Sequence, residues 1–220
     1  AAANPGLGIR ISEDAIRAER AILSDGAFAR ERLGIWPTVG DERAIPPELW
    51  DRATLADVEA VRDRASLGVD ATPDHSAAAI AAFGGDVGEL VERREGVGWV
   101  LERVVEIAVR HKAVVSIAVS SPAAFLVPAL EARRVKVRKI AAAEEYAACA
   151  RIYEAIADAR FVARTSADLE EAVGRLRKKT VSGDRFTWRR DLGDVCAFTA
   201  LTLAFGPAAP RRSEPWVAFG

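Results

Sequence analysis

The stretch that decides the fold is SLGVDATPDHS, residues 66–76, in which a short apolar run ends on Asp70 and turns into a second apolar run, residues 77–83. The turn contains Thr72, Pro73 and Asp74. Proline presets one turn dihedral, and aspartate bonds nearby backbone amides. The pattern therefore predicts a β-hairpin with Asp70 at the end of a largely buried strand, either as a turn residue or as part of a site.

The composition describes a chain that can bury a sizeable core. It has 220 residues, half of them hydrophobic, which predicts one main domain with an appendage. Lys and Arg number 31 against 32 Asp and Glu, so the net charge alone does not indicate a nucleic-acid partner. Residues 133–220, however, hold 17 basic and 11 acidic side chains, so the positive charge gathers in the second half.

Cysteine usage and hydropathy exclude several classes of protein. Cys149 and Cys196 lie far apart with no C-x-x-C spacing, which argues against a zinc site or a disulfide framework. No apolar run approaches the roughly 18 residues that span a bilayer, and the N-terminus has no signal pattern. The sequence therefore predicts a soluble protein of a reducing compartment, with no membrane partner.

The order of the elements predicts an α/β fold. Three strand candidates in meander precede a helix, a fourth strand, a helix, a fifth strand and further helices. This order is that of the ribonuclease H-like fold, a mixed five-stranded sheet with helices on both faces. We expect residues 1–64 to form a linker with short helices, residues 65–206 the domain and residues 207–220 a tail. The expected strands are residues 66–71, 76–83, 87–94, 113–121 and 135–140.

This topology brings candidate metal ligands together. The ends of the first and fourth strands lie close in such a sheet, and a late helix can bring its N-terminus beside them. Three carboxylates placed there would repel one another, and divalent cations such as Mg²⁺ or Mn²⁺ relieve the repulsion. Two such ions can activate a water and stabilise the leaving oxygen of a phosphodiester.

Two of the three positions carry acids. Asp70 ends the first strand, and Asp194 precedes the last helix, where it also suits an ordinary helix cap. The fourth strand offers only hydroxyl and apolar side chains near its end, residues 116–121, and no acid, so the site is either incomplete or completed by an acid from another element. Asp74, His75 and Asp191 are second-rank candidates.

The stretches LGVDATPDHSAAAIAAFG, SSPAAFLVPALEARRVKV and RRDLGDVCAFTALTLAFG together resemble the C-terminal nuclease domain of the tailed-phage large terminase, in its actinobacterial phage or prophage form. The front segment, residues 4–36, resembles the stretch by which that family leaves its ATPase domain. The motifs are moderately specific one by one, and their joint order is more so.

The resemblance implies an endonuclease that cuts concatemeric double-stranded DNA in the host cytoplasm with two Mg²⁺ or Mn²⁺ ions. Asp70 and Asp194 match two of the family's three aspartates, and the third falls on Ala118. It also implies an ATPase domain in the full-length protein, and the small terminase and the portal as partners. The alternatives are a catalytically silent nuclease-fold module that holds DNA or contacts the portal and, less favoured, a resolvase or transposase-like recombinase.

Basic clusters in the second half suit phosphate contacts that are independent of DNA sequence. A solvated charged surface is the other interpretation of each cluster. Trp188, between two of the basic groups, is expected to pack at the edge of the core rather than to stack on a base. The DNA-binding candidates are Arg134, Lys136, Arg138, Arg177, Lys178, Lys179, Arg185 and Arg189.

Overall fold

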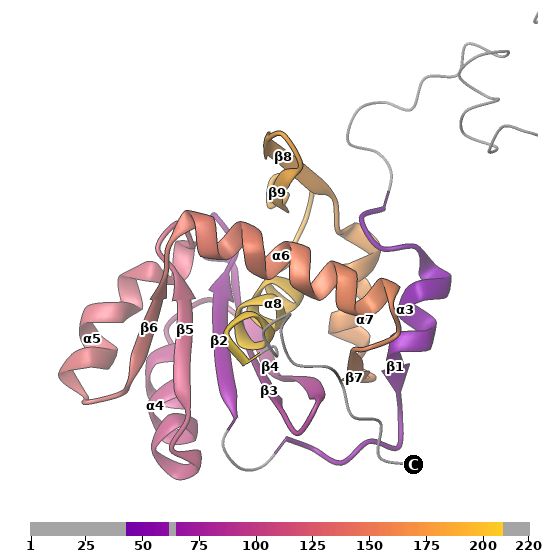
Figure 1. Cartoon of the computed structure of the whole chain (residues 1–220). Coiled ribbons are helices and arrows are strands. Elements are labelled where there is room, and N and C mark those ends of the chain that lie inside the picture. The colour runs from indigo at the N-terminus through magenta and orange to yellow at the C-terminus, as the bar shows by residue number, and fades with distance from the viewer. Residues whose placement is uncertain (1–42, 62–64, 209–220) are drawn as a thin grey trace, which may run out of the picture. The chain divides into compact units, whose positions relative to one another are not determined.

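The computed structural model describes residues 43–61 and 65–208 (Figure 1). The predicted hairpin is present, with β2 (Ser66–Ala71) antiparallel to β3 (Ala77–Gly84). Thr72 closes the turn, because its amide donates to the Ala77 carbonyl at 2.9 Å and its hydroxyl accepts from the Ala77 amide at 3.0 Å. This double contact fixes where β2 ends, and therefore where Asp70 lies.

All five predicted strands form, and two short strands extend the sheet to seven in the order β1-β7-β4-β3-β2-β5-β6. β3 is antiparallel to both of its neighbours, and every other pair is parallel. The added strands, β1 and β7, are two and three residues long, too short for a hydrophobic pattern. The bounds are β1 Thr54–Leu55, β4 Val87–Glu95, β5 Val114–Ala118, β6 Val137–Ile140 and β7 Val162–Arg164.

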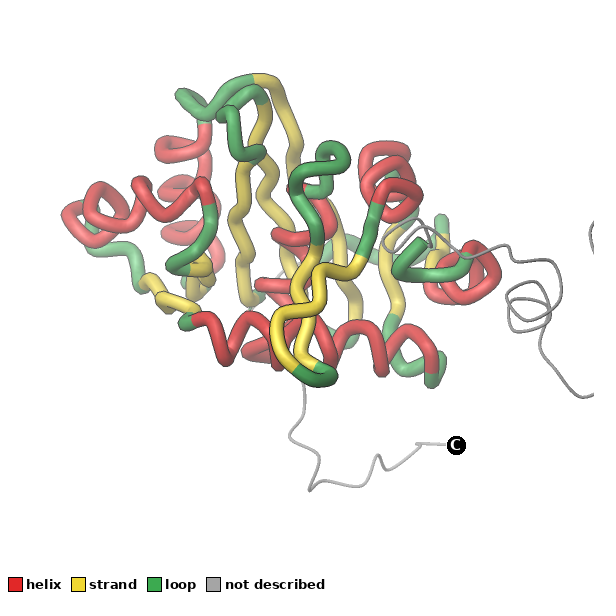
Figure 2. Tube along the Cα trace, turned by 90° about the horizontal axis from the view of Figure 1, so that it is seen from above, coloured by secondary structure: helices red, strands yellow, loops and turns green. Residues whose placement is uncertain are grey.

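Helices cover both faces of the sheet, as predicted (Figure 2). One face packs against α4, the 3-10 helix η1 and α5. The other packs against α8, with α6, α7 and α3 completing the core around it. The bounds are α3 Pro47–Ala53, α4 Val100–His111, η1 Pro122–Leu126, α5 Val127–Ala132, α6 Ala142–Ala157, α7 Ala167–Arg175 and α8 Cys196–Ala208.

Helix α8 lies directly on β2 because glycine leaves room for it. A Cβ at Gly68 would lie 1.9 Å from the carbonyl oxygen of Ala200. On the outer side, a Cβ at Gly206 would lie 2.6 Å from the Cβ of Ala148 on α6. The helix is therefore enclosed between the sheet and α6, which explains its apolar sequence. In the described ranges no helix is long and apolar enough to cross a membrane.

Residues upstream of β2 belong to the same packed unit. Contacts group the described residues from Arg43 to Ala208 as one compact unit. The Trp50 ring packs edge-on against Phe198 of α8 at a centroid distance of 5.7 Å, and the Ala44 amide donates to the Leu176 carbonyl. Trp50 thus anchors this segment to the core, and the packed unit begins before residue 65. The helices expected within residues 1–42 and the tail from residue 209 lie outside the described residues.

A separate two-stranded hairpin follows α7. It consists of β8 (Lys178–Ser182) and β9 (Arg185–Trp188), and in Figure 1 it projects beyond α6. The pattern of residues 185–190 favours a short strand, which forms as β9, but the pattern of residues 167–179 wrongly predicts one helix that continues through Lys179. Helix α7 instead ends at Arg175, because the buried Leu176 has extended backbone angles and directs the chain into β8.

We expect Gly68→Ala to lower the free energy of unfolding by about 3 kcal/mol or more, because α8 would have to move off the sheet. Urea denaturation measures the change. Gly174→Ala is the matched control, since a Cβ there meets nothing within 4 Å, and its stability should stay equal or rise by up to about 1 kcal/mol. Equal stabilities for the two variants would contradict the close contact.

Candidate functional site

Four positions form a row across the face of the sheet that α8 covers. Asp70 of β2 pairs with Ala79 of β3, and Ala79 pairs in turn with Arg93 of β4. On the other side, the β2–β5 register continued by two residues sets Ala118 level with Asp70. The order in space is therefore Ala118, Asp70, Ala79, Arg93, with neighbours about 5 Å apart.

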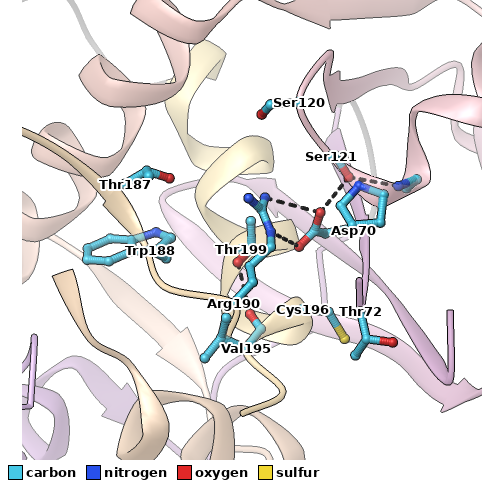
Figure 3. A network of polar contacts seen from close by, with 12 residues as sticks. Asp70, Thr72, Ser120, Ser121, Thr187, Trp188, Arg190, Val195, Cys196 and Thr199 are labelled. Carbon is cyan, nitrogen blue, oxygen red and sulfur yellow. Dashed lines mark hydrogen bonds and ion pairs between the residues drawn. The ribbon is translucent and has the colours of Figure 1, made fainter. Parts of the chain in front are cut away.

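Asp70 is completely buried and bonded at both carboxylate oxygens. The Ser121 hydroxyl donates to Oδ1 at 2.5 Å. Arg190 donates from Nε to Oδ2 and from Nη2 to Oδ1, each at 3.3 Å, so that its guanidinium faces the carboxylate (Figure 3). Burial raises the pKa of the Asp70 carboxyl, although Arg190 and Ser121 oppose the shift. Asp70 is thus the acceptor in a buried ion pair.

A second buried carboxylate, Glu145 of α6, belongs to the same network. Its Oε2 accepts from the Ser120 hydroxyl at 2.5 Å, and its Oε1 accepts from Thr187 at 3.3 Å. Nη2 of Arg190 lies 3.5 Å from Oε1. One guanidinium therefore lies between two buried carboxylates.

Glu145 is a functional candidate that was not predicted from the sequence. A signal was available, because Glu145 lies four residues before Cys149 on the buried face of α6. Its neighbour Glu144 is the ordinary acid of a helix start, since it accepts from the Ala141 amide. A charged residue on an otherwise apolar helix face indicates a buried polar contact.

Asp194 is held at the start of α8. Its Oδ1 accepts from the Cys196 amide at 2.9 Å, which satisfies a free donor of the helix end. Its Oδ2 accepts from Nε of Arg93 at 3.0 Å and from Nη2 at 2.5 Å. Burial acts to raise the pKa of Asp194, but the bonds from Cys196 and Arg93 outweigh it and lower the pKa. Asp194 therefore caps the helix, as the more ordinary interpretation predicts, and also pairs with the last member of the row.

Asp70 and Asp194 lie on the same side of the sheet but in separate ion-pair networks. Burial raises the pKa of the Cys196 thiol, and its hydrogen bond to Asp194 and the charges of Asp194 and Asp70 add to the shift. Within residues 43–61 and 65–208, no group of three or more His, Cys, Asp or Glu side chains is placed to hold a metal ion. The acidic groups are instead neutralised by arginines.

Ala118, the position expected to carry the third acid, has apolar neighbours. Ala118 is fully buried and packs with Ile140 of β6 and Leu203 of α8. The acid that comes nearest to completing the site is Glu145, through Ser120 and Arg190.

The second-rank candidates make local contacts. Asp74 accepts from the amide and hydroxyl of Ser76, and Asp191 pairs with Arg189. Hydrogen bonds from these neighbours lower the pKa of each carboxyl to about 2. The His75 ring packs against a phenylalanine of η1. None of the three joins the Asp70 network by a hydrogen bond within the described residues.

Four of the predicted DNA-binding residues are engaged by neighbours. Arg138 pairs with Glu144 and Arg189 with Asp191. Arg177 donates to the carbonyls of Gly174 and Leu176. The Lys178 ammonium lies 3.4 Å from the centre of the Tyr153 ring and 4.7 Å from that of Phe186, a cation–π arrangement.

The other four are exposed and form no ion pair within the described part of the chain: Arg134, Lys136, Lys179 and Arg185. Lys179 and Arg185 both lie on the projecting β8–β9 hairpin. Trp188 is buried, and its indole donates to the Thr202 hydroxyl at 2.9 Å, so it packs as predicted and is not a stacking platform.

Solved structures of large terminases share this architecture. The nuclease of the large terminase from thermophilic phage G20c matches with a TM-score of 0.57 and 14% identity, over 71% of this chain and 95% of that one. The Thermus phage P74-26 large terminase nuclease domain matches with a TM-score of 0.55 and 15% identity, over 71% of this chain and 92% of that one. This chain has the fold of large terminase nuclease domains. No protein-family model and no curated protein matches the sequence.

The large terminase of bacteriophage HK97 matches over more of this chain. The TM-score is 0.59 at 15% identity, and the alignment covers 94% of this chain and 53% of that one. The chain therefore spans about half of that terminase. Structures of the G20c nuclease with bound magnesium, cobalt and zinc also match. These comparisons confirm the ribonuclease H-like fold class, and the actinobacterial type stays a prediction.

We expect Asp194→Asn to lower the free energy of unfolding by about 1.5 kcal/mol at pH 7, because asparagine still caps α8 but no longer pairs with Arg93. A lowered pKa in the folded state means that this stabilisation is present above the ordinary aspartate pKa of about 3.9 and is lost as the pH falls. In urea denaturation, the difference in the free energy of unfolding between variant and parent should therefore become smaller as the pH falls toward about 3.

The control for this experiment is Asp158→Asn, which breaks an exposed pair with Arg160 and should change stability by less than about 0.5 kcal/mol. The Arg93 pair contributes nothing to stability if Asp194→Asn lowers the free energy of unfolding by no more than Asp158→Asn does. The same holds if the loss caused by Asp194→Asn persists in acid.

Proposed function

We propose that this chain is the nuclease domain of a phage large terminase and that it acts on double-stranded DNA during genome packaging in the host cytoplasm. The observation that carries the proposal is the arrangement of Asp70 at the end of β2 and Asp194 at the start of α8, on the same side of a sheet with the terminase nuclease fold. In the full-length protein, the partners would be its ATPase domain, the small terminase and the portal.

The residues present do not fit a site for two divalent ions. Ala118 offers no ligand, and it is buried against Ile140 and Leu203. Both oxygens of Asp70 already accept hydrogen bonds, and Asp194 is paired with Arg93. We therefore propose that the domain as it stands binds DNA and cuts it weakly or not at all, which is the silent-module alternative.

Metal-dependent cleavage is the second candidate. It is favoured by the match to structures of the G20c terminase nuclease with bound magnesium, cobalt and zinc. Mg²⁺ or Mn²⁺ would then supply the Lewis acid and an activated water.

The two candidates are separated by Ala118→Asp. Incubated with supercoiled plasmid and Mn²⁺, the unchanged protein should nick little or none, and the variant should nick at least about tenfold faster because it regains an anionic ligand. The gain should disappear in Ala118→Asp/Asp70→Asn, with circular dichroism to check folding. Strong nicking by the unchanged protein that survives Asp70→Asn would overturn the assignment of the site.

The free cations of the β8–β9 hairpin are the proposed DNA contacts. Lys179 and Arg185 are exposed and form no ion pair with the described residues, so their charge is available for phosphate. The hairpin projects beyond α6, where a duplex can approach it (Figure 1). Lys178 has its ammonium over Tyr153 and is expected to stiffen the hairpin instead.

Replacing Lys179 and Arg185 with alanine should weaken binding to a duplex of any sequence. The slope of log affinity against log salt should become shallower by about 1 for each cation removed. Fluorescence anisotropy with a labelled duplex at several salt concentrations measures both effects. A matched control replaces Arg110 and Arg160, which are already paired with Glu106 and Asp158. If both double variants have the parent's slope, the hairpin is not part of the DNA surface.

A further inference from the structure

The most unusual group in the molecule is the guanidinium of Arg190. Its side chain is only 17% exposed, and it lies between two carboxylates that are 0% and 5% exposed, those of Asp70 and Glu145. It donates to Asp70 from two nitrogens and to Glu145 from one. Two buried negative charges without a cation would be strongly destabilising, so this site requires a positive charge.

Hydroxyl groups occupy further acceptor sites of the two carboxylates. Ser121, the N-cap residue of η1, donates to Asp70, and Ser120 and Thr187 donate to Glu145. A divalent ion needs carboxylate lone pairs and space for its retained waters. Here the lone pairs are directed to arginine and hydroxyl donors.

The segment that carries Arg190 is fixed at both ends. Trp188 is buried at the end of β9, with its indole bonded to Thr202 of α8. Asp194 is bonded to the start of α8 and to Arg93. The few residues between these anchors have little freedom to withdraw the guanidinium, so Arg190 is part of the folded site.

We propose that Arg190 is the resident cation of this site as long as Ala118 supplies no acid: it neutralises Asp70 and Glu145 in place of a divalent ion and keeps such ions out. The inference rests on the proposed function for the identity of the competitor, a divalent cation. It is tested without DNA, so that its failure is distinguishable from failure of the DNA-binding proposal.

The experiment follows thermal unfolding of the whole chain in MnCl₂ and in EDTA, with Mn²⁺ binding measured by electron paramagnetic resonance. In the parent, neither additive should move the Tm. Arg190→Gln should have a lower Tm in EDTA, should bind Mn²⁺ at least about tenfold more tightly than the parent, and should regain Tm as Mn²⁺ is added. Arg189→Gln, which removes an adjacent cation paired with Asp191, should behave as the parent does.

Adding Glu145→Gln to Arg190→Gln should remove most of the gained Mn²⁺ affinity, which tests whether both carboxylates form the site. Mn²⁺ binding by Arg190→Gln no tighter than by Arg189→Gln would overturn the proposal. If Arg190→Gln does not fold, the triple variant Asp70→Asn/Glu145→Gln/Arg190→Gln should fold, because neither carboxylate is then left as an unpaired buried charge. If that variant also does not fold, the proposal for Arg190 is overturned as well.

Discussion

The contact on which the rest of the structure depends is that of α8 with β2 at Gly68. A helix normally packs about 10 Å from a sheet, and only the absence of a side chain lets a helix carbonyl come as close as it does here. The approach places the first residues of α8 above the row that contains Asp70 and Arg93. It also makes α8 a buried layer between the sheet and α6, so the helix can be apolar on all sides.

The acids near the start of α8 belong to two arginine-centred networks. Arg190 donates to Asp70 and Glu145, and Arg93 donates to Asp194. Arginine suits both places, because its planar fork presents several donors and it stays charged when buried. Arg190 meets both oxygens of Asp70, whereas Arg93 directs two donors to one oxygen of Asp194. The small Ala79 separates the two networks along the sheet. This division explains why two acids on one side of the sheet do not form a single carboxylate cluster.

Much of the fold could be predicted from the sequence because its signals are local. The Thr72-Pro73-Asp74 turn, the apolar strands on either side and the buried Trp50 and Trp188 all follow from residue types in short windows. The strands β1 and β7 could not be predicted, because they are too short for a pattern and form through pairing with distant partners. The end of α7 was missed for a similar reason, since burial of Leu176 overrides the helical pattern.

The site was predictable only in part. Strand order places Asp70 beside the end of the strand that became β5, because β2 and β5 are neighbours in this topology. Ala118 itself was singled out by the resemblance to the terminase family. The partners of the acids did not follow, since Arg190 lies 120 residues from Asp70 in sequence and Glu145 approaches from a helix. Pairing between distant charged residues depends on the final packing of α6 and α8, which no local pattern encodes.

The β8–β9 hairpin has a packed base and an exposed tip, although β8 is only five residues long. At its base, Lys178 is stacked on Tyr153 and Phe186, and its antiparallel partner Trp188 belongs to the core. Toward its tip, the residues around Gly183 are exposed and do not pack in the core. The tip can therefore accumulate substitutions or accept an inserted peptide while the base stays constant, so the reach and charge of this arm can diverge among relatives without a change of fold.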